Sequence, residues 1–254
     1  IEAFGRHLIE QGHKVAVLAV DPSSPVSGGS ILGDKTRMEE LSREANAFIR
    51  PSPSSGALGG VAQKTRETKL LCEAAGYDVI LVETVGVGQS EYEVAGMVDF
   101  FLVLMLPNAG DELQGIKKGI LELADAVVIN KADGEFQAQA ERTRGHYQNA
   151  LDLLGRRSDW TPRVLSCSAL EDTRIDAIWQ MIGEFRVKAE AHGAFADRRA
   201  RQSLEWMQQL ILALVEARLT RNERLNQRRR ELESRVSSGD MTPYAAASDI
   251  VALL

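Results

Sequence analysis

Residues 14–20 read KVAVLAV, an almost unbroken apolar run that is rich in β-branched side chains. Strands that are buried on both faces of a parallel sheet have this composition. Before this run, residues 1–11 place their apolar side chains on one helical face, and Gly12 ends that predicted helix. Similar short runs recur along the chain, at 47–50, 78–84 (DVILVET), 99–106 (DFFLVLML), 126–130 (AVVIN) and 163–168 (RVLSCS).

Helical patterns separate these predicted strands, near 35–45, 61–75, 113–123, 135–155 and 173–190. Strands joined by helical crossovers indicate a doubly wound, mostly parallel α/β sheet of the P-loop NTPase type. Such sheets bind their ligands at the carboxyl ends of the strands. We therefore search for functional residues where each predicted strand ends.

The strand pattern stops near residue 194, and an all-α C-terminal extension is predicted after it. Thr242-Pro243 predicts the start of a last helix, with a capping side chain followed by proline in the first turn. We expect two domains, 1–194 and 195–254. The extension carries apolar side chains at helical spacing that need a partner, either the α/β domain or a second subunit: Leu204, Met207, Leu210, Ile211, Leu214 and Leu219.

Composition excludes several classes of protein. The chain has 254 residues and a net charge of −6, which argues against a nucleic-acid-binding protein with a basic surface. Its longest apolar stretch, residues 100–107, is far shorter than the roughly 20 residues that span a bilayer, so no membrane segment is expected. Two distant cysteines, Cys72 and Cys167, disfavour a disulfide scaffold and favour a reducing, cytoplasmic setting.

Asn130-Lys131-Ala132-Asp133 comes directly at the end of a predicted buried strand. An Asp carboxylate there can accept hydrogen bonds from guanine N1–H and the 2-amino group, while the Lys stem packs over the base. A second segment, Ser168-Ala169-Leu170, also ends a strand and could supply a backbone N–H to the base oxygen. The alternative is a polar helix start and an ordinary turn.

Acidic residues end two other predicted strands. Glu83 closes DVILVET and is placed to hold Mg²⁺, and Gly86 lets a backbone N–H approach the γ-phosphate. Asp21 begins a glycine-rich loop that runs to Asp34 and suits a metal-linked switch. The alternatives are a plain strand-end acid and a plain turn. A dinucleotide-binding site is disfavoured because Glu91 stands where its fingerprint has a third glycine.

The phosphate-binding loop is not found in these residues. Residues 28–36 (GGSILGDKT) imitate one, but Asp34 is inserted and the segment lies several residues beyond the strand. We expect the strand and loop that hold the α- and β-phosphates to precede Ile1, because such loops lead into a helix. A further polar stretch, 110–119 (GDELQGIKKG), follows a strand and could also be an N-capped amphipathic helix.

Together VDPSSPVSGGSILGDKTRM, ETVGVGQSE, GDELQGIKKG, NKAD and SAL resemble the MeaB/ArgK family of SIMIBI-class GTPases. The resemblance implies binding of GTP and GDP with Mg²⁺, slow hydrolysis and a homodimer held by the C-terminal helices. It also implies a chaperone that assists adenosylcobalamin-dependent methylmalonyl-CoA mutase by gating cofactor loading and protecting the mutase from inactivation.

By motif position, the resemblance assigns a role to each matching residue. The Mg²⁺ carboxylates fall on Asp21, Asp34 and Glu83, and the guanine site on Asn130, Lys131, Asp133, Ser168, Ala169 and Leu170. The catalytic third switch falls on Asp111, Gln114 and Lys117. Val87 occupies the position where Ras-like proteins carry a water-orienting Gln, so we expect activation to come from the third switch.

Three other functions remain open. A metal-chaperone GTPase of the same class usually needs a Cys/His cluster, which this sequence lacks. A GTP-dependent small-molecule kinase, of the kind named in arginine/ornithine transport, would need an acceptor pocket that no motif indicates. A catalytically silent interaction module would require that no phosphate-binding loop be present in the cell.

Overall fold

The computed structural model describes residues 1–21, 38–53, 58–84, 90–108, 118–154 and 160–253. The chain forms two compact units, Ile1–Arg198 and Arg199–Leu254. Every described strand lies in the first unit, and the described part of the second is helical. The predicted roles of the two domains, a GTPase domain at residues 1–194 and a dimerisation extension at residues 195–254, stay predictions.

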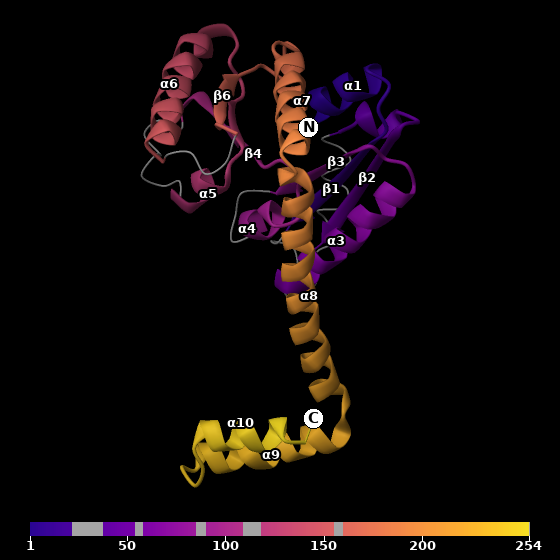
Figure 1. Cartoon of the computed structure of the whole chain (residues 1–254), viewed down its shortest axis with the longest axis vertical. Helices are drawn as coiled ribbons and strands as arrows, with labels where there is room; N and C mark the ends of the chain where they lie inside the picture. The colour runs from indigo at the N-terminus through magenta and orange to yellow at the C-terminus, as the bar shows by residue number, and fades with distance from the viewer. Residues whose placement is uncertain (22–37, 54–57, 85–89, 109–117, 155–159, 254) are drawn as a thin grey trace. The chain divides into compact units, whose positions relative to one another are not determined.

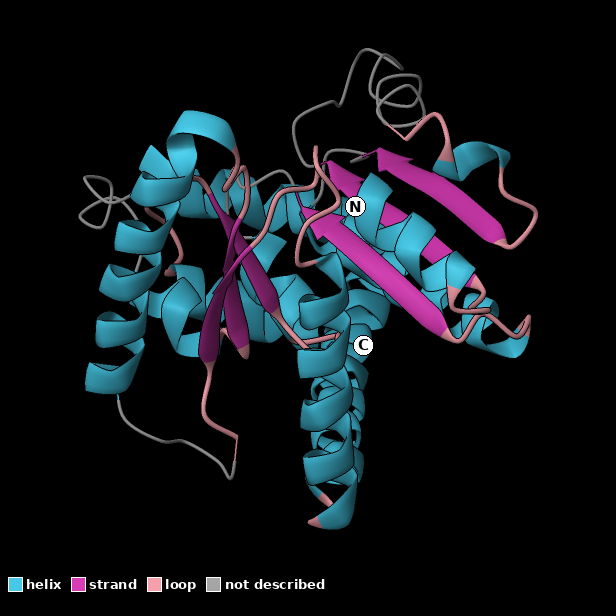
Figure 2. Cartoon of the chain, turned by 90° about the horizontal axis from the view of Figure 1, so that it is seen from above, coloured by secondary structure: helices cyan, strands magenta, loops and turns pink. Residues whose placement is uncertain are grey.

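The described strands of the first unit form two parallel sheets. One has the order β2-β1-β3, and the other has the order β4-β5-β6. Figure 2 shows the strands as two separate groups. The predicted parallel α/β architecture is therefore confirmed. The strands are β1 (Val15–Asp21), β2 (Ala47–Pro53), β3 (Val79–Thr84), β4 (Leu102–Met105), β5 (Ala126–Ile129) and β6 (Arg163–Ser166).

Helices lie between most of the successive strands, as well as before the first and after the last, and they cover the sheets (Figure 1). They are α1 (Glu2–Glu10), α3 (Leu58–Ala74), α4 (Ser90–Ala95), α5 (Lys118–Leu123), α6 (Gln137–Leu154) and α7 (Ile175–Ala191), with 3₁₀ turns η1 (Leu41–Arg43) and η3 (Gly134–Phe136). Most lie where the helical patterns predict them, but α4 was not predicted.

Strand β5 shows why its residues form a central strand. All four side chains are fully buried, and they alternate between two faces. Val127 and Ile129 join the cluster that α6 covers, whereas Val128 packs with residues of α7. Because both faces are covered by helices, an uninterrupted apolar run is required here.

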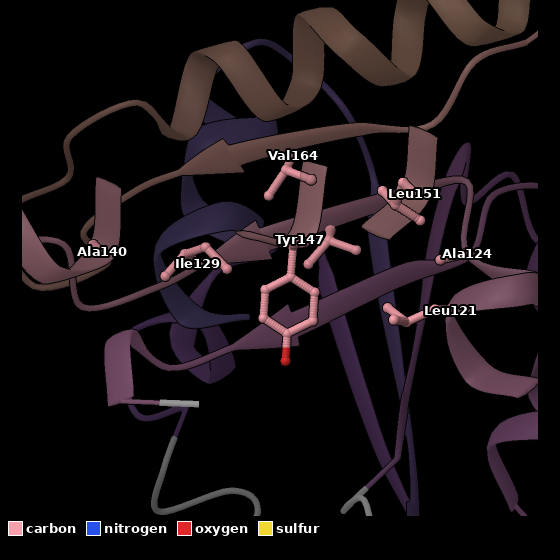
Figure 3. Close-up of a cluster of buried hydrophobic side chains, with 8 residues drawn as sticks. Leu121, Ala124, Ile129, Ala140, Tyr147, Leu151 and Val164 are labelled. Atoms are coloured by element: carbon pink, nitrogen blue, oxygen red, sulfur yellow. The ribbon is translucent and has the colours of Figure 1, made fainter. Parts of the chain in front are cut away.

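The cluster on the α6 side has Tyr147 at its centre (Figure 3). This side chain is 0% exposed and lies among the aliphatic side chains of Leu121, Ile129, Leu151 and Val164. An aromatic ring buries more apolar surface than any of its aliphatic neighbours, so Tyr147 contributes a large share of the hydrophobic stabilisation that fixes α6 on the sheet.

The predicted helix over 35–45 is wrong in its described part. Only the short turn η1 forms there, and Glu44 is already extended, with φ −72° and ψ 131°. Leu41 is fully buried against Gly5 of α1, where an added Cβ would lie 2.6 Å from the Leu41 Cδ2 atom. The chain then enters β2 at Ala47.

Strand β4 is shorter than the predicted run 99–106. Its ladder with β5 begins at Leu102, and the preceding Phe101 N–H donates to the Asp125 carboxylate at 2.8 Å. Asp125 also forms a bidentate ion pair with Arg198, at 2.8 Å to each carboxylate oxygen. Arg198 further donates to the Asp99 carbonyl at 2.5 Å, which fixes the start of α8 (Ala194–Arg221) on the first unit.

The second unit contains the rest of α8, α9 (Glu223–Ser237) and α10 (Pro243–Val251). The predicted all-α extension is interrupted at Asn222, whose side chain caps α9 by accepting from the Arg224 and Leu225 N–H groups. The predicted start at Thr242-Pro243 is confirmed, since the Thr242 side chain accepts from the Ala245 N–H. Within the described ranges, no helix is both long enough and apolar enough to cross a bilayer.

Candidate functional site

The loop that follows β5 is held to the loop that follows β6. The Asn130 side-chain oxygen accepts from the N–H of Lys131 at 2.8 Å and from the N–H of Ala169 at 3.1 Å. A further bond runs from the Ala132 N–H to the Cys167 carbonyl at 2.9 Å. One amide side chain therefore fixes the spacing of the two predicted base-binding segments.

Asp133 and Ser168 form the direct side-chain link between these segments. The Ser168 hydroxyl is fully buried and donates to the Asp133 Oδ2 atom at 2.5 Å. The same hydroxyl accepts from the Glu171 N–H at 3.1 Å. A carboxylate whose orientation is fixed in this way can accept parallel N–H donors from a flat heterocycle.

The loop after β6 is closed on itself by an antiparallel bridge. Ser168 and Thr173 exchange backbone hydrogen bonds of 3.1 and 3.0 Å. Between them, Leu170 is 85% exposed, so its side chain is free to contact a ligand. The structure therefore brings Asn130, Lys131, Asp133, Ser168 and Ala169 together, with Leu170 on the adjoining surface.

Left-handed backbone conformations gather at these two loops. Lys131 has φ +60°, and Asp172 and Arg174 have φ +51° and +61°. These are the non-glycine residues with positive φ in the described part of the chain. Each such conformation costs of order 1 kcal/mol or more, so the surrounding contacts must hold the loops in place.

Two of the three predicted metal residues, Asp21 and Glu83, lie at the ends of two paired strands. Asp21 is the last residue of β1 and Glu83 is the penultimate residue of β3. The register pairs Ala19 with Glu83 and Val20 with Thr84, so the two acidic residues lie at the same sheet edge. Among the described residues, no group of three His, Cys, Asp or Glu side chains is arranged to hold a metal ion.

Several predicted site residues lie outside the described residues. They are the metal candidate Asp34, the phosphate-contacting Gly86 and the third-switch residues Asp111, Gln114 and Lys117. The phosphate-loop imitation at 28–36 lies outside as well. Their predicted roles stay predictions.

A second layer of polar side chains, which the sequence did not predict, lies behind the loop after β6. The Glu141 Oε1 atom of α6 accepts from the Ser166 hydroxyl at 2.5 Å and from Arg174 at 3.1 Å. Its Oε2 atom accepts from Arg144 at 2.7 Å. These hydrogen bonds, with that from Ser166 the largest cause, lower the pKa of Glu141 to about 2.

No spacing in the sequence links Glu141, Ser166 and Arg174, because they come from a helix, a strand and a loop. Ser166 lies in the predicted strand 163–168, two residues before Ser168, so alternation places it on the same face. That alternation is the one signal that could have associated Ser166 with the site.

Comparisons with known proteins place this arrangement in a family. Residues 1–224 match the family described as "Methylmalonyl Co-A mutase-associated GTPase MeaB". The "GTPase ArgK" of Escherichia coli is 53% identical over 244 residues, which cover 96% of this chain and 74% of that protein. "Methylmalonic aciduria type A homolog, mitochondrial" of Mus musculus is 51% identical over 97% of this chain and 60% of its own length.

A solved structure described as "LAO/AO transport system kinase" agrees in fold as well as sequence. It superposes with a TM-score of 0.73 at 43% identity and covers 99% of this chain and 75% of its own. The family model matches most of the chain, and both of these relatives share more than half of their aligned residues with it. The chain belongs to the MeaB family of methylmalonyl-CoA mutase-associated GTPases and is a hydrolase acting on GTP.

Proposed function

We propose that the loops after β5 and β6 bind the guanine base of GTP. The observation that supports this most strongly is the pair of links between the loops, Asn130 to Ala169 and Ser168 to Asp133. Asp133 accepts from guanine N1–H and the 2-amino group, Lys131 covers one face of the base, and Leu170 contacts it from the β6 loop. Adenine offers no such pair of donors to a carboxylate.

Replacing Asp133 by Asn tests this proposal in the intact protein. An amide cannot accept both guanine donors, so GTP affinity should fall by about 2–4 kcal/mol. Xanthosine triphosphate should bind the variant better than GTP, since its base offers an acceptor where guanine has the amino group. Glu135→Gln, which removes a nearby carboxylate outside the two motifs, is the control. Unchanged GTP affinity in Asp133→Asn would rule out the guanine assignment.

The shared sheet edge of β1 and β3 supports a Mg²⁺ site formed by Asp21, Glu83 and Asp34. Carboxylate oxygens are the ligands that Mg²⁺ prefers, so the donor set fits the ion. When bound, the ion neutralises charge on the β- and γ-phosphates. Glu83→Gln should raise the Mg²⁺ concentration needed for half-maximal turnover, measured by magnesium titration. Identical titrations for the wild type and the variant would make Glu83 a plain strand-end acid.

We propose that the client protein of this GTPase is an adenosylcobalamin-dependent methylmalonyl-CoA mutase. The family description and the name of the mouse relative support this choice. The third switch, with Asp111, Gln114 and Lys117, couples the client to hydrolysis. Gln114→Ala and Lys117→Ala should lose most of the stimulation, measured as the ratio of turnover with and without the mutase. Full stimulation in both variants would place the activating group elsewhere.

The apolar stripe of α8 supports a homodimer formed through the C-terminal helices. Leu204, Met207, Ile211 and Leu214 are 49–68% exposed and follow the three- and four-residue spacing of helix-pairing positions. Replacing Leu204 and Ile211 together by Gln should give single chains in analytical ultracentrifugation. Leu153→Gln on α6, where the side chain is 88% exposed, is the matched control. A dimer that survives the double substitution would contradict this proposal.

The kinase named in the solved structure leads to a second candidate, phosphoryl transfer from GTP to a small guanidino or amino compound. Incubation with γ-labelled GTP and arginine separates the two candidates. Label recovered as inorganic phosphate supports hydrolysis, and label on arginine supports the kinase. Both products would arise at the same nucleotide site.

A further inference from the structure

The side chains behind the β6 loop form a closed triangle of hydrogen bonds. Ser166 donates its hydroxyl proton to Glu141 and accepts from the Arg174 guanidinium at 2.6 Å. The same guanidinium nitrogen also donates to Glu141 at 3.1 Å. Three segments, α6, β6 and the residue before α7, are thereby joined at one point.

Arg174 is the last residue of the loop that carries the base-binding segment. It has φ +61°, and Asp172 two residues earlier has φ +51°. A non-glycine residue leaves the left-handed region readily unless its surroundings hold it there. The contacts of the Arg174 side chain with Ser166 and Glu141 supply that restraint.

The restraint passes along the loop to the base-reading carboxylate. Thr173, the neighbour of Arg174, exchanges two backbone hydrogen bonds with Ser168. Ser168 in turn donates to Asp133. A continuous series of described contacts therefore runs from Glu141 through Arg174 and the 168–173 bridge to Asp133.

We propose that Glu141 and Arg174 are positioning residues for base selection, which hold the loop so that Ser168 orients Asp133. This inference rests on the proposed guanine binding, and neither residue touches the base. Loss of either side chain leaves Asp133 in place but removes an anchor of the 168–173 bridge, so that Ser168 orients the Asp133 carboxylate less firmly.

The surroundings of the triangle make it testable without loss of the fold. A cavity of about 190 Å³ lies beside it, with Asp133, Glu141, Ser166 and Arg174 among its lining residues, whereas Lys131 and Leu170 do not line it. The Arg174 side chain is 57% exposed and that of Glu141 is 40% exposed. Truncation of these side chains therefore enlarges an existing solvent-facing space and opens no hole in the apolar core.

The test compares guanine with hypoxanthine, which lacks the 2-amino group and so forms only one of the two contacts with the carboxylate. Dissociation constants for GTP and inosine triphosphate are measured on the intact protein for the wild type, Arg174→Ala and Glu141→Ala. We expect the preference for GTP over inosine triphosphate to fall about tenfold in both variants. A merely structural role would weaken both nucleotides equally and leave this preference unchanged.

Two further variants control the test. Arg144→Ala removes the third partner of Glu141, which lies on the same helix and is not among the lining residues of the cavity, so the preference should stay at the wild-type value. Arg174→Lys keeps a cation that can donate to Glu141 and should restore part of the preference. Circular dichroism and thermal unfolding check that each variant is folded.

The outcomes separate this inference from the guanine assignment. If Asp133→Asn changes the base preference but Arg174→Ala and Glu141→Ala do not, the positioning role is wrong and guanine binding stands. If Arg144→Ala lowers the preference as much as Arg174→Ala, the effect does not pass through the loop and the inference is overturned. If Asp133→Asn itself has no effect, the proposed base site fails and the inference fails with it.

Discussion

Helices α6 and α8 differ in what their apolar side chains contact. The 18 residues of α6 bury Ala140, Thr143, Tyr147 and Leu151 against the sheet, whereas none of the 28 residues of α8, all described, is buried. Both carry apolar residues at helical spacing, so the spacing alone does not distinguish a helix that has its partner from one that needs another. Burial distinguishes them, because the apolar side chains of α6 are covered by the sheet whereas those of α8 are left exposed in the single chain.

The largest effect in this comparison is expected at the centre of the α6 cluster. Tyr147→Ala removes a fully buried ring and leaves a cavity between α6 and the sheet, so the free energy of unfolding should fall by about 3–5 kcal/mol. Urea denaturation measures the change. A loss below about 1 kcal/mol would show that α6 is held mainly by other contacts.

A somewhat smaller effect is expected where α8 begins. Asp125→Ala leaves the Arg198 guanidinium and the Phe101 N–H without their shared acceptor, at a cost of about 3 kcal/mol in unfolding free energy. Arg186→Ala, which breaks the exposed pair with Glu190, should change stability by less than about 0.5 kcal/mol. Equal losses in the two variants would contradict the importance of burial here.

The exposed part of α8 provides the contrasting substitution. Leu214 is 68% exposed, so Leu214→Ala should change the unfolding free energy of dilute, single chains by less than about 0.5 kcal/mol. Leu151→Ala on α6, where the side chain is 6% exposed, should cost about 2–5 kcal/mol. Similar losses at both positions in urea denaturation would mean that α8 is already covered in the single chain.

The last and smallest expected effect is a pH dependence of the free energy of unfolding, which arises from Glu141 on α6. The pKa of Glu141 is lowered from 4.5 to about 2, so its stabilising contribution is complete above pH 4.5 and is lost as the pH falls toward 2. The stability difference between the wild type and Glu141→Gln should shrink over the same range. Ser166→Ala removes the largest cause and should raise the pKa of Glu141, measured by NMR titration. An unchanged pKa in Ser166→Ala would assign the shift to the arginines.

The sequence was informative where local pattern and burial agree. The apolar run 126–130 predicted β5 because helices cover both of its faces, and the Thr242-Pro243 start of α10 needed only local chemistry. The helix predicted over 35–45 was wrong in its described part, where only η1 forms, and the packing of Leu41 against Gly5 is a contact across 36 positions that no periodicity records. The break at Asn222 had a local signal, a capping residue, but the apolar spacing of α8 concealed it.

The candidate site likewise contains one part that could be predicted from the sequence and one part that could not. The two base-reading segments could be predicted because each directly follows a strand, and strand ends meet at one edge of a parallel sheet. The triangle of Glu141, Ser166 and Arg174 could not be predicted, since its members are 8 to 33 positions apart and belong to three different elements. Side-chain contacts between elements become visible only when the fold is known.

The contacts of Asp125 also bear on how the chain folds during synthesis. Its carboxylate lies at the start of β5, but the guanidinium that neutralises it comes 73 positions later. Until the ribosome has released residue 198, β5 can pair with its neighbours only by burying an uncompensated charge or by keeping that end open to water. The α/β unit can therefore close fully only after the first turn of α8 has been made, so its last folding step waits for the helix that leads out of it.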